Sequence, residues 1–246
     1  MSTTHASSSR SLVVIPTYNE RDCVTPITQA VLAAAPDVHV LIVDDNSPDG
    51  TGAIADQLAA ANPRVRTLHR QGKQGLGAAY RNAFDLALDQ GWNHIVQMDA
   101  DFSHDPQDVP RLLQAIRAGA DLAIGSRYTR GGGTRNWGLG RRLISRFGCL
   151  YAQIILGVRV RDLTSGFKAW SAEGLRRIRL GEVATRGYGF QIEMNYRALQ
   201  NGLRVTEVPI LFVERRAGAS KMSGQIFTEA IMAVWKMRWL IRPVGP

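Results

Sequence analysis

The sequence predicts an α/β fold: a Rossmann-like, mostly parallel sheet flanked by helices, followed by a C-terminal amphipathic helix. Short apolar runs alternate with longer segments of helical pattern, which is typical of parallel βαβ units. Clusters of polar residues follow four of these apolar runs. The chain has 246 residues, 45% of them apolar, which is enough for one large α/β domain or two small ones.

The apolar runs predict five strands before residue 130. The predicted strands are residues 11–15, 39–45, 65–69, 94–98 and 121–127. Between them, periodic apolar residues predict helices over 24–34, from 51 to about 61, from within 72–88 after a glycine-rich loop, and from 107 to about 118.

The polar clusters stand where four of these strands end. They are PTYNE (16–20), DDNSPDG (44–50), DAD (99–101) and GSR (125–127). In open parallel sheets, ligands bind outside the carboxyl ends of the strands. We therefore expect the four clusters to line one edge of the sheet and to form the binding site.

Asp99 and Asp101 are the first candidates for chemistry. Aspartate is also common in turns, where its side chain accepts hydrogen bonds from nearby amides. In an extended chain, however, residues at i and i+2 point the same way, so the two carboxylates would share one side. Two such oxygen donors suit Mg²⁺ or Mn²⁺, which would complete its ligand shell with a diphosphate and water.

Other polar side chains fit the same site. Arg127, Arg215 and Lys221 are candidates for binding phosphate oxygens. Asp45 is placed to accept hydrogen bonds from a sugar or base, and Tyr18 to stack on a base.

The totals restrict the class of partner. The formal net charge of +9 predicts an anionic partner such as a phosphate or an anionic membrane surface. The two cysteines show no disulfide or zinc pattern, which fits a reducing cytoplasm. The sequence contains no P-loop, dinucleotide fingerprint or GxSxG elbow. A nucleic-acid partner is not expected, because no recognisable RNA or DNA module accompanies the basic residues.

The chain is expected to divide into a disordered tail (1–10), a catalytic domain (11–224) and a C-terminal amphipathic helix and tail (225–246). No run approaches the ~18 uninterrupted apolar residues of a membrane span. Residues 127–146 carry six arginines and no acid, and the apolar side chains of 143–154 recur on one helical face. Residues 225–242 also combine apolar and basic residues with two tryptophans. These segments predict binding to an anionic membrane surface; packing on the core is the alternative.

Eight stretches together resemble the dolichyl- and polyprenyl-phosphate mannose synthases, family-2 glycosyltransferases with the GT-A fold. They are VVIPTYNE, VDDNSPDGT, GLGAAYRNAF, MDADFSHDP, GSRY, DLTSGFKAW, GYGFQIEM and EVPILFVERRAGASKMSG. They span roughly residues 11–224 in order. PTYNE and the DxD motif mark only the broad family, whereas GSRY, DLTSGF and RxxGxSKM point to the polyprenyl-phosphate branch.

The resemblance implies a role for each matching residue. The nucleotide sugar is expected to contact Pro16, Tyr18, Glu20, Val43, Asp45, Asp99, Ala100 and Asp101. Asp101 would hold the metal together with Asp99, and the catalytic residues would be Asp101 and the phosphate-binding Arg127, Arg215 and Lys221. Gln191 and Glu193 stand where relatives with hydroxyl acceptors carry an acidic base motif.

The implied activity is that of an inverting, metal-dependent enzyme that moves mannose from GDP-mannose to polyprenyl (dolichyl) phosphate. It would act at the cytoplasmic face of a membrane, held there by its surface helices or by a membrane-anchoring partner protein. Nothing in the residues distinguishes guanine from uracil, so a UDP-glucose or UDP-GlcNAc transferase of the same fold is the alternative. A non-catalytic binding protein with a degenerate transferase fold is a third reading.

Overall fold

The structure is a computed structural model that describes residues 9–183, 185, 187–214 and 224–241, with backbone alone for Tyr188 and 224–231. Arg10, counted in the predicted tail, is tied to the domain, because its backbone N–H donates to Asn93 Oδ1 at 2.8 Å and its guanidinium lies over the Trp92 ring. Residues 1–8 of that tail lie outside the described residues.

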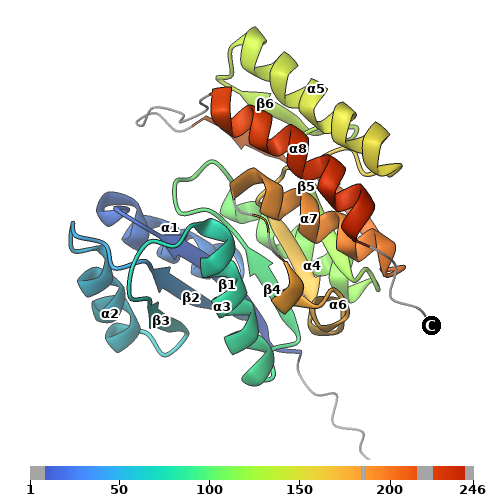
Figure 1. Ribbon diagram of the computed structural model, residues 1–246. Helices are drawn as coiled ribbons and strands as arrows, with labels where there is room; N and C mark the ends of the chain where they lie inside the picture. The colour runs from blue at the N-terminus through green and yellow to red at the C-terminus, as the bar shows by residue number, and fades with distance from the viewer. Residues whose placement is uncertain (1–8, 184, 186, 215–223, 242–246) are drawn as a thin grey trace, which may run out of the picture.

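A seven-stranded sheet in the order β3-β2-β1-β4-β7-β5-β8 forms the centre of the molecule (Figure 1). Its strands are β1 (Ser11–Thr17), β2 (Val38–Asp44), β3 (Val65–His69), β4 (His94–Gln97), β5 (Leu122–Ser126), β7 (Lys168–Ser171) and β8 (Val205–Pro209). The pairs β1–β2, β1–β4, β2–β3 and β5–β8 are parallel. The prediction of a mostly parallel α/β sheet is confirmed.

One central strand runs against the others. Strand β7 pairs antiparallel with both β4 and β5, and Lys168 stands opposite Gln97 on one side and Ile124 on the other. The sequence analysis did not identify this strand, because its four residues are too few to show an alternating pattern. Its insertion separates β4 from β5, yet leaves their carboxyl ends at the same edge of the sheet.

Helices cover both faces of the sheet, and alternate residues of β1 show how. Leu12 and Val14 point into one apolar core, whereas Val13 and Ile15 point into the other. The second core is packed by α1 (Arg21–Ala34), α2 (Thr51–Ala61) and α4 (Val109–Arg117). The first is packed chiefly by α3 (Leu76–Asp89), α6 (Ala172–Arg177) and α7 (Gly187–Gln200). The remaining short helices are η1 (Pro106–Asp108) and η2 (Leu180–Glu182).

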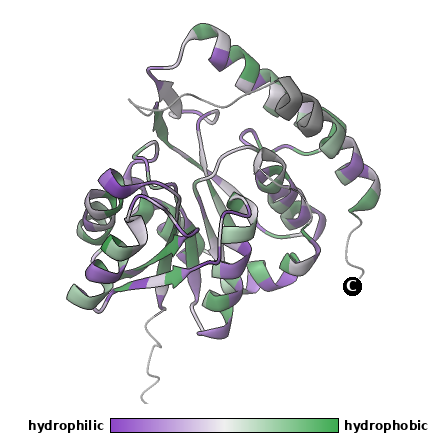
Figure 2. Cartoon of the chain, turned by 60° about the vertical axis from the view of Figure 1, so that its left-hand side comes forward, coloured by the Kyte–Doolittle hydropathy of each residue, from purple (hydrophilic) through white to green (hydrophobic). Residues whose placement is uncertain are grey.

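Two long helices lie side by side beyond the sheet, α5 (Leu139–Leu156) and α8 (Gly224–Leu240) (Figures 1 and 2). A small parallel sheet of β6 (Gly133–Arg135) and β9 (Leu211–Val213) lies close to them. The predicted stripe on α5 is exposed: Leu143, Phe147, Leu150 and Ile154 keep 45–69% of their accessible surface. Core packing is therefore wrong for this stripe, but it holds for Ala152 and Leu156 on another face of α5 and for Val234 and Met237 of α8, which are buried in the first core. No helix among the described residues is long and apolar enough to cross a bilayer.

Candidate functional site

The edge of the sheet that was predicted to carry the site is present in the structure. Strands β1, β2, β4 and β5 all run in one direction, so their carboxyl ends meet at one edge. Three non-glycine residues just beyond β1, β2 and β4 have positive φ: Asn19 (60°), Asn46 (57°) and Phe102 (58°). Asparagine tolerates this conformation, but for a bulky residue such as phenylalanine it is an outlier. Such strained backbone clusters at binding sites, where the surrounding structure enforces it.

A cleft of about 590 Å³ opens at this edge. Its wall includes Asn19, Glu20, Asp49, Asp101, Phe102 and Glu214, which come from the loops after β1, β2, β4 and β9. Asp101 thus lies in the wall of this cleft.

Asp99 and Asp101 do not lie in an extended strand. Strand β4 ends at Gln97 and the chain bends at Ala100, so the geometric argument that both carboxylates share one strand face is wrong. They are nevertheless close enough to interact. Burial raises the pKa of Asp99 to about 7, and the charges of Asp101 and Glu20 add to the shift, which Tyr80 partly opposes. Asp101 accepts the backbone N–H of Ser103 at 3.0 Å.

The two carboxylates fit a divalent cation. A cation between Asp99 and Asp101 would relieve the repulsion that raises the Asp99 pKa. Within the described part of the chain, no three His, Cys, Asp or Glu side chains converge on one point. The remaining ligands would therefore come from substrate phosphates and water, as is usual for Mg²⁺.

His104 and Tyr80, which the sequence analysis did not single out, flank Asp99. His104 Nδ1 lies 4.0 Å from Asp99 Oδ2. Burial lowers the pKa of His104 to about 4, so the ring is neutral at pH 7 and the contact is not an ion pair. Within the described residues His104 Nδ1 is buried without a hydrogen-bond partner, and burial together with the charge of Asp99 raises the pKa of the buried Tyr80 hydroxyl.

Asp45 has a partner that sequence reasoning missed. Its carboxylate is bound by Arg70, which also donates to Asn82 Oδ1 and Gln74 Oε1, each at 3.0 Å. Burial raises the pKa of Asp45 and Arg70 opposes the shift. The signal was available in the sequence, because Arg70 directly follows the third strand at the same edge.

The other residues expected to contact the nucleotide lie at this edge. Pro16 and Val43 face each other in the β1–β2 register, and the Val43 side chain is fully buried. The ring of Tyr18 has Lys73 Nζ 4.0 Å from its centre. The backbone N–H of Glu20 donates to Thr51 Oγ1 at 3.1 Å, and Ala100 is 4% exposed.

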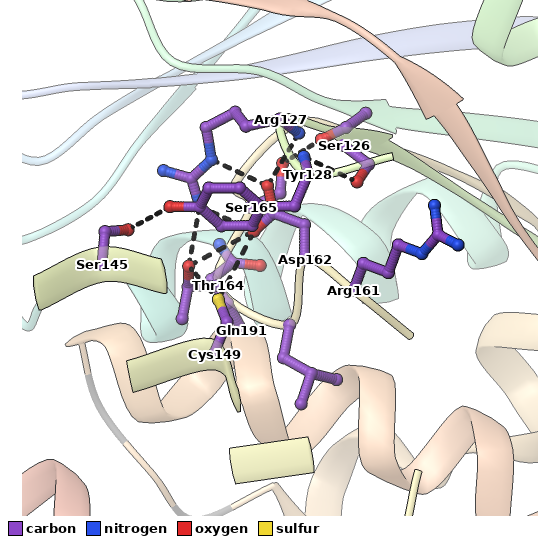
Figure 3. A network of polar contacts seen from close by, with 12 residues as sticks. Ser126, Arg127, Tyr128, Ser145, Cys149, Arg161, Asp162, Thr164, Ser165 and Gln191 are labelled. Carbon is purple, nitrogen blue, oxygen red and sulfur yellow. Dashed lines mark hydrogen bonds and ion pairs between the residues drawn. The ribbon is translucent and has the colours of Figure 1, made fainter. Parts of the chain in front are cut away.

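Arg127 is held by Asp162, a residue of the DLTSGF motif (Figure 3). Its Nε and Nη2 lie 2.7 and 2.6 Å from the two carboxylate oxygens, and Nη2 also donates to Thr164 Oγ1 at 2.7 Å. Burial would raise the pKa of Asp162, but the charge and hydrogen bonds of Arg127 outweigh it and hold that pKa below its ordinary value. The phosphate-binding role of Arg127 stays a prediction.

The same network joins the site to helix α5. The hydroxyl of Tyr128 donates to Ser145 Oγ at 2.6 Å, and the Cys149 thiol lies 3.4 Å from Thr164 Oγ1 (Figure 3). Ser145 and Cys149 both belong to α5. The helix with the exposed apolar stripe is therefore fixed to the loops around Arg127.

Arg215 and Lys221 lie outside the described residues, so their roles stay predictions. Glu214, which directly precedes Arg215, lines the cleft and is paired with Arg141.

Glu193 is occupied by structural partners. It accepts the backbone N–H and the hydroxyl of Thr185 at 3.0 and 2.6 Å, and Nε of Arg197 at 2.9 Å. Gln191 is buried and receives two hydrogen bonds at its Oε1 atom. At the two positions where the resemblance predicts a base motif in hydroxyl-acceptor relatives, this chain therefore has a buried amide and a carboxylate that is already paired.

Comparison with known proteins supports the resemblance. The model of "Glycosyl transferase family 2" matches residues 12–179. The chain is 51% identical over 234 residues, 95% of its length and 88% of the relative's, to the polyprenol monophosphomannose synthase of Mycolicibacterium smegmatis. It is 49% identical over 231 residues, 94% of its length and 93% of the relative's, to the undecaprenyl-phosphate mannosyltransferase of Micrococcus luteus.

Solved structures show the same fold at low sequence identity. Glucosyl-3-phosphoglycerate synthase from Mycobacterium tuberculosis with phosphoglyceric acid matches with a TM-score of 0.71 at 18% identity, covering 95% of this chain and 81% of that one. The mannosyltransferase PcManGT from Pyrobaculum calidifontis with GDP-Man and Mn²⁺ matches with a TM-score of 0.59 at 16% identity, covering 93% and 69%. The match to the family model agrees with the arrangement of the strands at the edge of the sheet. This chain therefore belongs to glycosyl transferase family 2.

Proposed function

We propose that the protein transfers mannose from GDP-mannose to a polyprenyl phosphate and forms a β-linked polyprenyl-phosphate mannose. The relatives at about half identity carry the names of enzymes that mannosylate polyprenyl or undecaprenyl phosphate. The observation in this chain that carries the proposal is the pair Gln191 and Glu193. An amide and a carboxylate already bound by Thr185 and Arg197 do not suit the deprotonation of a sugar hydroxyl.

A phosphate acceptor removes the need for that base. With a second pKa near 6, a phosphate monoester is mostly dianionic at neutral pH and is already a nucleophile. One of its oxygens would attack the anomeric carbon while the bond from that carbon to the GDP oxygen breaks, which inverts the α-linked sugar to β. The enzyme has to bring two anions together, so cationic side chains such as Arg127 would offset the repulsion.

Asp99 and Asp101 would hold Mg²⁺ or Mn²⁺, and the metal would stabilise the charge that develops on the leaving diphosphate. Among the structural neighbours, one is described with Mn²⁺ and UDP and another with Mn²⁺ and GDP-Man. Asp45 with Arg70, and Tyr18 with Lys73, would form the wall of the nucleoside pocket.

The lipid acceptor requires access to a membrane, and we assign this role to the outer surface of α5 and α8. Trp235, Trp239 and Leu240 of α8 are 43–77% exposed, and α8 contacts α5, the helix with the apolar stripe. The exposed basic residues here include Arg142, Arg146, Lys236 and Arg238. Apolar and basic side chains on one surface suit the interface of an anionic bilayer. The protein would then act as a peripheral enzyme on the cytoplasmic face, alone or with a membrane-anchoring partner.

The test is the transfer of radiolabelled sugar to a polyprenyl phosphate in detergent, with GDP-mannose, UDP-glucose and UDP-GlcNAc compared as donors. We expect transfer from GDP-mannose, loss of transfer with EDTA, and recovery with Mg²⁺ or Mn²⁺. Transfer from a UDP-sugar alone would establish the alternative donor. Failure with every donor would argue for the non-catalytic reading.

A further inference from the structure

A directed chain of buried hydrogen bonds runs beneath the site from Trp170 through Gln97 to Gln191. Trp170 in β7 donates its indole N–H to Gln97 Oε1 at 3.2 Å. Gln97 Nε2 in turn donates to Gln191 Oε1 at 2.8 Å and to the backbone oxygen of Gly166 at 3.0 Å. These three side chains are at most 3% exposed.

The chemistry of Trp170 fixes the direction of this chain. An indole nitrogen only donates, so the amide of Gln97 must turn its oxygen toward Trp170 and its nitrogen toward Gln191. Gln191 must then turn its own oxygen toward Gln97. No other arrangement of the two amides satisfies both the indole N–H and the Gln97 N–H that faces Gln191.

Lys168 fixes the same end of the Gln191 amide. Its Nζ, fully buried, donates to Gln191 Oε1 at 2.8 Å and to the Gln191 backbone oxygen at 3.1 Å. Burial lowers the pKa of Lys168, but an amine has enough N–H groups for both bonds whether or not it is charged. Gln191 Oε1 therefore receives two donors.

The opposite end of the Gln191 amide is buried. Its Nε2 atom has no hydrogen-bond partner among the described residues, although buried polar groups are normally paired. A Cβ atom built on Gly166 would lie 3.7 Å from this nitrogen and 3.4 Å from Asp99 Oδ2. The bare Cα of Gly166 thus leaves a small gap that has Gln191 Nε2 and the Asp99 carboxylate on its walls.

We propose that Gln191 is a positioning residue for Asp99: the Trp170–Gln97 chain and Lys168 lock its amide so that an N–H donor faces the Asp99 carboxylate, directly or through one water. This N–H donor holds one oxygen of the Asp99 carboxylate from the side of the core and leaves the other oxygen to face the substrate. Since an amide N–H cannot accept a proton, the same lock keeps a base out of this position. The inference thus deepens the proposed function and rests on it, because without a base at this position the phosphate acceptor must arrive already ionised.

The test compares two buried tryptophans. Trp170→Phe removes one of the groups that set the direction and leaves Gln97 Oε1 buried without its donor, whereas Trp92→Phe removes an indole N–H that donates to Gln90 Oε1, also at 3.2 Å, in the same apolar core. Both variants should lose similar stability, measured by urea unfolding. Only Trp170→Phe should move the side-chain ¹⁵N–H resonances of Gln191, identified by their absence in Gln191→Met.

The functional measurement is the Kd of GDP in the presence of Mg²⁺, by calorimetry. We expect Trp170→Phe to raise this Kd about five- to tenfold, the effect of one misdirected hydrogen bond, and Trp92→Phe to leave it unchanged. If the Gln191 side-chain resonances and the Kd of GDP change equally in the two variants, the proposal is wrong. The resonances need no substrate, so they test the chain even if transfer to a lipid phosphate fails.

A second variant covers the case in which Trp170→Phe does not fold. In Gln97→Glu the carboxylate still accepts from Trp170 and can pair with Lys168, but it cannot donate to Gln191. Once Lys168 is paired with the new carboxylate rather than with Gln191 Oε1, the Gln191 amide reverses, so that Nε2 donates to this carboxylate and Oε1 turns toward Asp99. The Kd for GDP and Mg²⁺ should rise as in Trp170→Phe, and an unchanged Kd would contradict the proposed lock.

Discussion

The guanidinium of Arg127 and the carboxylate of Asp162 form a two-point ion pair, although they stand 35 residues apart in the chain. The Arg127 side chain is 8% exposed and that of Asp162 is fully buried. Asp162 also accepts the backbone N–H of Arg127 at 3.0 Å, so it fixes both the backbone and the side chain of this residue.

Asp162→Asn should destabilise the protein by about 3–5 kcal/mol, because it leaves a buried guanidinium without its counter-charge. Urea unfolding monitored by circular dichroism measures the change. Glu173→Gln is the control, because its contact with Arg176 is long and exposed and should contribute less than about 1 kcal/mol. If the two substitutions lower the free energy of unfolding equally, the buried Arg127–Asp162 pair contributes no more to stability than an exposed ion pair.

The same pair predicts a dependence of stability on acid. Arg127 holds the pKa of Asp162 below its value of 3.8 in the unfolded chain. The folded state then binds fewer protons than the unfolded state, so the stabilisation is present above pH 4 and is lost as the pH falls through the folded pKa. The difference in unfolding free energy between wild type and Asp162→Asn should therefore shrink below pH 4. A difference that stays constant down to pH 2 would contradict the assignment.

Asp101→Ala should abolish sugar transfer and leave the fold intact, because the carboxylate lies at the cleft and, within the described part of the chain, accepts a hydrogen bond only from the backbone N–H of Ser103. Radiolabelled transfer and circular dichroism, measured on the same sample, test both parts. Asp105→Ala, which alters a nearby cap at the start of η1, is the control and should keep its activity. A well-folded Asp101→Ala variant with normal turnover would remove Asp101 from the metal site.

Glu193→Gln should not behave as the loss of a general base. Its oxygens are bound by Thr185 and Arg197, so the substitution should reduce stability and affect turnover only modestly. Across pH, the rate should rise with the second ionisation of the acceptor phosphate and then level off, in both wild type and variant. A pH profile whose carboxylate limb disappears in Glu193→Gln would show that Glu193 is the base after all.

Arg142→Glu with Arg146→Glu should weaken sedimentation with anionic vesicles, since each basic residue near such a surface contributes about 1 kcal/mol. Arg141 is left unchanged because it is paired with Glu214. The matched control replaces two exposed arginines of other helices, Arg117 and Arg176, with glutamate. Binding of soluble GDP-mannose should stay normal in both double variants.

The apolar stripe should provide the part of vesicle binding that salt does not screen. In wild type, sedimentation should therefore fall but not vanish as salt rises, whereas Leu143→Ser with Phe147→Ser should leave only the salt-sensitive part. If these variants pellet like wild type at every salt concentration, the α5 surface is not the membrane contact.

The sequence by itself determined the α/β architecture, the edge at which the site lies and most of the candidate residues. Strand and helix patterns are local, and parallel strands bring their carboxyl ends together whatever their order. The loops after β1, β2, β4 and β5 were thus predictable from four polar clusters.

Only the tertiary structure decided how those residues are held. The hydrogen-bonded partners lie far apart in the sequence. Asp45 and Arg70 are separated by 25 positions, Arg127 and Asp162 by 35, and Gln97 and Gln191 by 94. The antiparallel strand β7 brings Lys168 and Trp170 beneath the site, although its four residues carry no readable period. Such pairings depend on how distant segments pack, and the burial that gives them their strength does not exist until the chain has folded.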